Sequence, residues 1–355
     1  MGALPGPCRV RRQAADVEAF PVMIPEEIRS GLLQHHGLTQ VHPLAAGMSG
    51  AELYGCQGPR RLVLRRWPSG TKLDRVALVH RVISQAQKHC PLLPEYQRGR
   101  AGETVVVDAR GGLWELVDWM PGEPLSYAAT RNQVAAGAGA IAAVHRALRI
   151  QGQSEQPVAA VRDRQVRIGA LDAALPRAVA TDPPRQLPSE LADTVVRAAA
   201  WLRTHWAMVS TSHSRRLEAV GRQPRLAHYV LRDVHREHVL FRQGQPSGII
   251  DFDALRVDSP ATDLARWTGS FAAYWQDPDG TIEAVVAGYG DQEPLFNRQP
   301  QAELRTLLRA LIDSAGWISL ANWVVWLVVE GRQFPDWGRV DERLKRLLEQ
   351  IRCTL

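Results

Sequence analysis

Lysine is almost missing from this 355-residue chain. Of its 43 basic side chains only Lys72, Lys88 and Lys345 are lysines, so 40 are arginines, and the formal net charge is +6. A basic excess of this kind is compatible with binding to nucleic acid or another polyanion. It also arises where arginine simply serves as the usual surface cation, and composition alone favours this plainer explanation.

Cysteine is scarce as well. The four cysteines, Cys8, Cys56, Cys90 and Cys353, lie far apart and form no CxxC pair. A zinc ribbon or a disulfide framework needs closer, patterned spacing. Residues Met1–Gln13 also lack the apolar core of a secretory signal. We therefore expect a reduced, cytoplasmic protein.

Long apolar runs are missing too. The most apolar stretch, Trp317–Val329, spans only thirteen residues, which is too short to cross a bilayer and suits a buried helix. We expect no membrane partner. The apolar fraction of 45% and the charged fraction of 23% are ordinary for globular proteins. Composition therefore excludes a largely disordered chain.

The order of β-prone and helical segments predicts two lobes. We expect a flexible arm over residues 1–20, a small lobe over 21–121 with one helix at Leu73–His89, and a helical lobe over 122–355. The β-prone runs of the small lobe are Val41–Ala45, Ala51–Cys56, Leu62–Trp67, Thr104–Asp108 and Leu113–Trp119. The sequence thus predicts an α+β fold, with a small antiparallel β-sheet joined to a larger, mainly helical lobe.

Helical periodicity after the hinge near Trp119–Gly122 is clear in several stretches but not in all. Residues 151–188 are rich in proline and arginine and show no clear pattern. The predicted helices are Asn132–Leu148, Ser189–Met208, Asp263–Trp275, Gln301–Glu330 and Val340–Arg352.

One block carries most of the chemical information. It reads LRDVHREHVLF over residues 231–241, then a turn, then GIIDFD over residues 248–253. A hairpin between these strands would bring Asp233, His238 and Asp251 close together. Phosphoryl transfer requires such a cluster, because one carboxylate positions the acceptor hydroxyl and others hold the cations that neutralise the phosphates.

This block resembles the catalytic segment of the aminoglycoside phosphotransferase and choline kinase superfamily, which has the protein-kinase fold. The superfamily pattern is HGDxxxxN, a short hairpin, and ID[FW][DE]. The resemblance implies that Asp233 is the catalytic residue and Asp251 the main magnesium ligand, with Asp253 also near the metal. In DSPATDLAR, over residues 258–266, the resemblance implies that Asp263 anchors the catalytic loop.

The resemblance continues upstream. Residues 46–52, AGMSGAE, resemble the glycine loop over the ATP phosphates, with Gly47, Gly50 and the Ser49 hydroxyl facing phosphate. Arg65 stands where the third strand supplies a phosphate-binding cation. Residues 115–122 resemble the fifth strand and the hinge, which implies that adenine binds at Asp118–Met120, on the backbone near Met120.

The chain departs from the superfamily pattern at three places. Leu231 and Arg232 replace the His and the small residue before the catalytic Asp, and His238 replaces the metal-binding Asn. The carboxylate expected on the small lobe's helix, as the partner of Arg65, has no clear counterpart between Asp74 and Glu95.

Two interpretations of His238 remain open. As a metal ligand, imidazole favours Mn, Co, Ni or Zn over Mg, and activity should then fall below about pH 6.5, because imidazole binds metal only when neutral. Alternatively, His238 only hydrogen-bonds within the loop, and Asp251 and Asp253 alone hold the metal.

The resemblance as a whole implies an ATP-dependent phosphotransferase that uses Mg or Mn and acts on a hydroxyl of an unidentified small molecule. The alternative is a pseudokinase, an ATP-binding or merely kinase-shaped scaffold. Nucleic-acid binding is the third possibility, but the chain lacks an aromatic-basic stacking motif, so we expect no nucleic-acid partner. The sequence does not indicate the oligomeric state.

Overall fold

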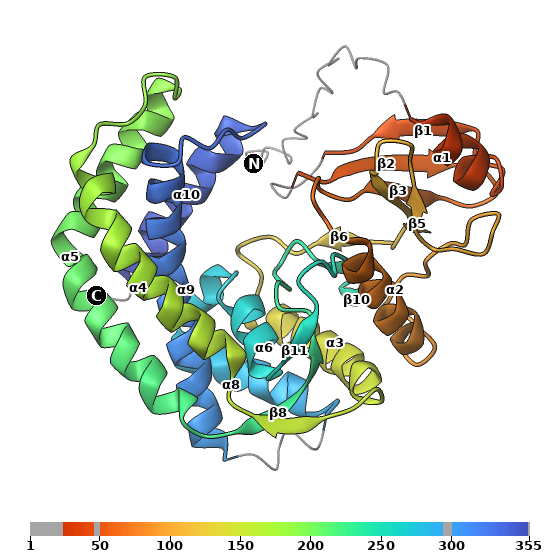
Figure 1. Cartoon of the computed structure of the whole chain (residues 1–355). Helices are drawn as coiled ribbons and strands as arrows, with labels where there is room; N and C mark the ends of the chain where they lie inside the picture. The colour runs from red at the N-terminus through yellow and green to blue at the C-terminus, as the bar shows by residue number, and fades with distance from the viewer. Residues whose placement is uncertain (1–23, 46–49, 294–299, 354–355) are drawn as a thin grey trace, which may run out of the picture.

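The computed structural model describes residues 24–45, 50–293 and 300–353 of the chain. The flexible arm predicted over residues 1–20 lies outside these ranges. Figure 1 shows a small lobe built around a β-sheet, and a larger lobe of helices on the other side of the molecule. This is the α+β arrangement that the sequence predicts.

The small lobe holds a five-stranded antiparallel sheet in the order β1-β2-β3-β5-β4. All five predicted strands are present, each within a few residues of its expected bounds. They are β1 (Gln40–Pro43), β2 (Glu52–Gln57), β3 (Leu62–Arg66), β4 (Val106–Val107) and β5 (Leu113–Asp118). Alternate residues of β3, Leu62 and Leu64, pack against Ile28 and Leu32 of a short helical segment made of α1 (Glu26–Ile28) and a π-helical turn (Arg29–Leu33).

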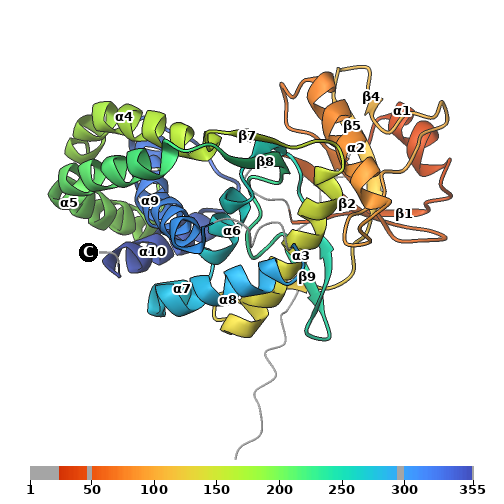
Figure 2. The ribbon, with the colours of Figure 1, turned by 90° about the horizontal axis from the view of Figure 1, so that it is seen from below.

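Helix α2 (Leu73–Gln87) connects the two lobes physically. Its apolar residues Val76, Val79, Val82 and Ile83 are fully buried or nearly so, and they belong to the main hydrophobic core that continues into the large lobe. Figure 2 shows α2 between the sheet and α3 (Arg131–Arg149). The spacing of these residues was the basis of the predicted helix, which ends two residues earlier than expected.

The large lobe is mainly helical. Its remaining helices are α4 (Ala159–Ala180), α5 (Ser189–Gly221), α6 (Ala261–Thr268), α7 (Ala272–Gln276), α8 (Pro278–Gly290), α9 (Gln301–Val328) and α10 (Trp337–Arg352). Two small sheets, in the orders β10-β9-β6 and β11-β8-β7, hold the segments around the predicted catalytic block. Their strands are β6 (Glu123–Pro124), β7 (Ser154–Gln156), β8 (Arg225–Val230), β9 (Val239–Arg242), β10 (Gln245–Ile249) and β11 (Arg256–Asp258).

The structure corrects three sequence-based expectations in this lobe. Residues 151–188 contain the helix α4, whose buried residues Ile168, Leu171, Leu175 and Ala178 have helical spacing that the surrounding arginines and an interior proline obscure. Helix α5 runs on to Gly221, beyond its expected end. The single helix expected over Asp263–Trp275 is two helices, α6 and α7.

Helix α9 occupies the centre of the large lobe. By length and composition alone it could cross a membrane. In the structure it packs against α4, α5, α6 and α10, which surround it in Figures 1 and 2. Trp317, at the middle of the helix, is 1% exposed. The apolar character of α9 is therefore explained by its place in the core.

Candidate functional site

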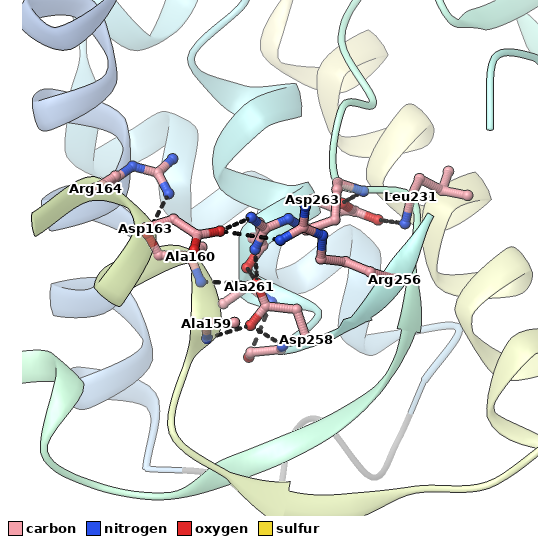
Figure 3. Close-up of polar contacts among 12 residues, drawn as sticks. Ala159, Ala160, Asp163, Arg164, Leu231, Arg256, Asp258, Ala261 and Asp263 are labelled. Carbon is pink, nitrogen blue, oxygen red and sulfur yellow. Dashed lines mark hydrogen bonds and ion pairs between the residues drawn. The ribbon is translucent and has the colours of Figure 1, made fainter. Parts of the chain in front are cut away.

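A buried carboxylate on α6 anchors the predicted catalytic loop between β8 and β9. Asp263 of α6 accepts hydrogen bonds from the backbone N–H groups of Leu231 (2.7 Å) and Arg232 (2.6 Å), and from Nε2 of His145 (2.8 Å). Its side chain is fully buried. The expectation that Asp263 anchors the loop is confirmed by these contacts, part of which Figure 3 draws.

The loop has a left-handed residue where the superfamily pattern has a small one. Arg232 has a φ of +69°, a conformation that glycine adopts freely and other residues only at a cost of about 1–2 kcal/mol. Its guanidinium forms ion pairs with Asp258 and Asp163. Asp258 also accepts the backbone N–H groups of Ala159 and Ala160 at the start of α4 (Figure 3). These ion pairs explain how an arginine is accommodated there.

Asp233 follows directly and lies at the surface of a cleft. Its side chain is 49% exposed, and its Oδ1 accepts a hydrogen bond from Nε of Arg266 at 2.8 Å. Arg266 is the last residue of the DSPATDLAR stretch, and sequence reasoning gave it no role. The ion pair fixes the direction of the Asp233 carboxylate and leaves its second oxygen without a protein partner in the described part of the chain.

His238 and Asp251 face each other, as the hairpin spacing predicts. Nδ1 of His238 lies 2.9 Å from the backbone oxygen of Asp233, and Nε2 lies 3.5 Å from Oδ2 of Asp251. A carbonyl oxygen only accepts, so Nδ1 carries the proton, and in the neutral ring the lone pair of Nε2 is directed at the Asp251 carboxylate. A cation between the two groups would satisfy both of them.

Asp253 is close in sequence to Asp251, but its main partner is Arg65. One of its oxygens forms an ion pair with Arg65, and the other, Oδ1, is buried with no hydrogen-bond partner among the described residues. Burial raises the pKa of Asp253 above its ordinary value, and the charge of Arg65 opposes that shift. The unpartnered oxygen is a further group that a cation would satisfy.

The donor set fits a divalent cation. The imidazole nitrogen of His238 and the carboxylates of Asp251 and Asp253 are ligands for Mn or Zn, and the carboxylates suit Mg as well. Within residues 24–45, 50–293 and 300–353, no three His, Cys, Asp or Glu side chains are placed closely enough to form a complete protein site. Phosphate oxygens and water would therefore have to supply the remaining ligands, as is usual for nucleotide-bound metals.

The cation of the third strand has a partner that the sequence did not reveal. Arg65 of β3 lies opposite Glu115 of β5, with Nη1 3.5 Å from Oε1. Glu115 is 3% exposed, and its Oε2 accepts hydrogen bonds at 2.6 Å from Trp67 and from His80 of α2. A strand therefore supplies the carboxylate that was expected on the helix, and the helix supplies the histidine that holds it.

Electrostatics keep this group of side chains charged. Although burial alone would raise the pKa of Glu115, the hydrogen bond from His80 and the charge of Arg65 hold it below its ordinary value. Burial would likewise lower the pKa of Arg65, but Glu115 and Asp253 raise it above the usual range. Arg65 is therefore a permanently charged, largely buried cation facing the predicted metal site.

The residues predicted to bind the nucleotide are only partly described. Gly47 and Ser49 lie outside the described residues. Gly50 has a φ of +80°, and an added Cβ would meet no atom of the described residues within 4 Å, so they leave room for a phosphate to approach its backbone.

At the hinge, the Asp118 carboxylate accepts a hydrogen bond from Gln97 and forms an ion pair with Arg60. The backbone N–H of Asp118 donates to the backbone oxygen of Glu95. The backbone of Met120, where the resemblance places adenine, has no hydrogen-bond partner within the described ranges.

A cleft of about 840 Å³ opens from Asp233, His238 and Asp251 toward α9 and α10. Its walls combine aromatic and cationic side chains. The aromatic residues are Trp275, Trp323, Trp326 and Phe334. Trp317 and Trp323 are buried core residues, and Trp323 also lines the cleft. Trp326 is partly buried against the core and lines the cleft as well.

Comparisons with known proteins agree with this arrangement. A profile of the phosphotransferase enzyme family matches residues 41–316. A search of curated protein sequences gave no match. Among solved structures, an aminoglycoside phosphotransferase from Alicyclobacillus acidocaldarius is 15% identical, with a TM-score of 0.61 and coverage of 95% of this chain and 96% of that one.

Two further structures show the same likeness. A spectinomycin phosphotransferase in complex with ADP and spectinomycin is 10% identical, with a TM-score of 0.61 and coverage of 94% and 99%. A choline kinase from Cryptosporidium parvum is 11% identical, with a TM-score of 0.52 and coverage of 92% and 95%. At these identities the likeness establishes the fold, which is the two-lobed, kinase-like fold predicted from the sequence.

Proposed function

Because the chain belongs to the phosphotransferase enzyme family, we propose that it transfers the γ-phosphoryl group of ATP to a hydroxyl of a small molecule. The observation that carries the proposal is the convergence of Asp233, His238 and Asp251 on one cleft. The solved spectinomycin phosphotransferase complex with ADP supports a nucleotide as co-substrate.

In this mechanism Asp233 receives the proton of the acceptor hydroxyl as the oxygen attacks the γ-phosphorus. Its free oxygen faces the cleft, and the ion pair with Arg266 directs it. Arg65 would contact the phosphates, and the backbone of Met120 would pair with adenine. His238, Asp251 and Asp253 would hold the divalent cation, which supplies neutralisation of phosphate charge. Catalysis then rests on positioning and on charge stabilisation.

The proposal is tested by a turnover screen with ATP and either Mg or Mn against sugars, amino alcohols, nucleosides and hydroxy acids. We expect metal-dependent release of ADP with at least one acceptor, and a loss of about 10²–10⁴-fold in kcat for Asp233→Asn, because a general base contributes about that much. The matched control is Asp279→Asn, an exposed carboxylate on α8. Absence of turnover with every metal and acceptor, while ATP still binds, would instead support the scaffold alternative.

The role of His238 has its own test. If its Nε2 ligates the cation, we expect the wild type to prefer Mn over Mg, and His238→Asn to shift the preference toward Mg by about tenfold in kcat/KM, because Mg prefers oxygen ligands. The acid loss of activity near pH 6.5 should also disappear in the variant. An unchanged Mn/Mg ratio and an unchanged pH profile would mean that His238 serves only as a hydrogen-bonding group of the loop.

A further inference from the structure

The cleft beside Asp233 is strongly cationic. Seven of its lining residues are arginines, whereas only four are acidic, and two of those, Asp233 and Asp251, belong to the proposed catalytic machinery. The remaining acids are Glu237 and Glu342. A cleft that received a polycationic acceptor would need the opposite balance, because like charges repel strongly where side chains are partly buried.

One helix supplies much of this charge. Arg339, Arg343 and Arg346 are spaced four and three residues apart on α10, so they lie on one face of the helix, and all three line the cleft. Like charges at this spacing destabilise a helix. Figure 1 shows α10 beside α5 and α9, in the part of the large lobe away from the β-sheet lobe.

Two of these arginines have no carboxylate partner in the described parts of the chain. Arg343 forms no ion pair there, and Arg346 lies over the ring of Tyr127, 5.2 Å from its centroid, instead of against an acid. Burial and the charges of Arg266 and Arg346 lower the pKa of Arg343 to about 10, although the charge of Glu237 opposes this shift. The arginine is still protonated at neutral pH, so the cleft holds a cation that its own protein environment disfavours.

Arg164 of α4 extends this cationic surface close to the catalytic loop. Within the described residues its guanidinium donates a hydrogen bond to the backbone oxygen of Ala160 and forms no ion pair. Burial and the charges of Arg232 and Arg266 lower its pKa to about 10. Guanidinium groups bind carboxylate and phosphate oxygens in a bidentate manner, so an anionic ligand would relieve the repulsion on both sides of the cleft.

The aromatic wall completes the site. Trp323 and Trp326 of α9 and Phe334 face the same space as the arginines. Arg332 lies over the ring of Trp326, 4.5 Å from its centroid. We propose that the phosphoryl acceptor is an anionic alcohol, with a carboxylate or phosphate held by Arg343 and Arg346 and an apolar, flat part held by these rings. The inference rests on the proposed function for the identity of the cleft as the acceptor site.

The test uses four probes that share a benzyl alcohol and differ in charge: 4-(hydroxymethyl)benzoate, 4-(hydroxymethyl)phenylphosphonate, methyl 4-(hydroxymethyl)benzoate and 4-(aminomethyl)benzyl alcohol. Binding to the whole protein is measured by calorimetry, with no nucleotide present. We expect at least one of the two anions to bind about tenfold more tightly than the ester and the amine. The two anionic probes distinguish a carboxylate site from a phosphate site.

The variant Arg343→Gln should remove most of this preference, and Arg352→Gln, on the exposed face of the same helix, should retain it. The melting temperature of Arg343→Gln should stay at or above that of the wild type, because a repelled charge is removed. Equal or tighter binding of the amine, or an unchanged preference in Arg343→Gln, would overturn the inference. Anion binding without any phosphoryl transfer would support the anion site formed by the arginines, but it would overturn the proposed function and with it the role of the cleft as the acceptor site.

Discussion

We expect Glu115→Ala to lower the free energy of unfolding by about 3–5 kcal/mol, the cost of breaking a buried ion pair from one side. The substitution leaves Arg65 with only Asp253, and it removes the acceptor for Trp67 and His80, both of which are at most 5% exposed. Buried donors without acceptors add to the loss. Urea unfolding of the two proteins at pH 7.5 measures the difference.

The same sheet offers a matched control. Glu52 of β2 lies opposite Arg66 of β3, just as Glu115 of β5 lies opposite Arg65. The Glu52–Arg66 pair is much more exposed, at 45% and 36%, and exposed pairs contribute about 0–1 kcal/mol. Glu52→Ala should therefore cost less than about 1 kcal/mol. Similar costs at the two glutamates would show that the network around Glu115 is not what stabilises the small lobe.

The second large effect is acid sensitivity of the fold. Burial, and then the neighbouring charge of His145, lower the pKa of His228 to about 3. Burial and Arg216 lower the pKa of His213 to about 4. Both side chains are under 10% exposed. The unfolded chain binds these two protons near pH 6.5 and the folded chain does not, so stability is complete above pH 6.5 and falls as the pH decreases toward 4.

Each histidine should lower the free energy of unfolding by about 1.4 kcal/mol per pH unit below pH 6.5. Between pH 6.5 and pH 5 the two together should cost about 4 kcal/mol, which is a large part of the stability of an ordinary domain. His213→Leu should reduce the slope by the share of one histidine, because it removes one titrating group together with an Nδ1 atom that has no hydrogen-bond partner among the described residues. His89→Gln, at an exposed position, is the control. A free energy of unfolding that stays constant from pH 7 to pH 5 would contradict the lowered pKa values of His213 and His228.

This acid effect also bears on the His238 experiment. Loss of folded protein below pH 6 would imitate the loss of a metal ligand, so the pH profile of activity has to be compared at pH values where unfolding is absent. The metal preference in His238→Asn separates the two effects, since unfolding changes the rates with Mn and Mg alike.

Much of the site could be predicted from the sequence because its residues lie on short, ordered stretches. Asp233, His238 and Asp251 are separated by a loop and a hairpin, and local backbone geometry brings them together. The five strands of the small lobe were recognisable from β-branched residues between glycines. These features depend on interactions close along the chain.

What the sequence did not show depends on tertiary contacts. The partner of Arg65 lies fifty residues away, on a strand whose register decides which glutamate faces it. Arg343 and Arg346 belong to α10, and only the packing of this helix against α5 and α9 makes their side chains part of the cleft wall. Helix α4 was missed because arginines surround its buried apolar residues and Pro176 interrupts the pattern.

Whether Asp233 is the catalytic residue is tested most directly by comparing nucleotide binding with turnover. Wild type and Asp233→Asn are each titrated with a non-hydrolysable ATP analogue and then assayed for phosphorylated acceptor by mass spectrometry. We expect analogue dissociation constants within about twofold of each other, and phosphoryl transfer that is at least about a hundredfold slower in the variant. Equal transfer by the two proteins would show that Asp233 is not the catalytic residue of this cleft.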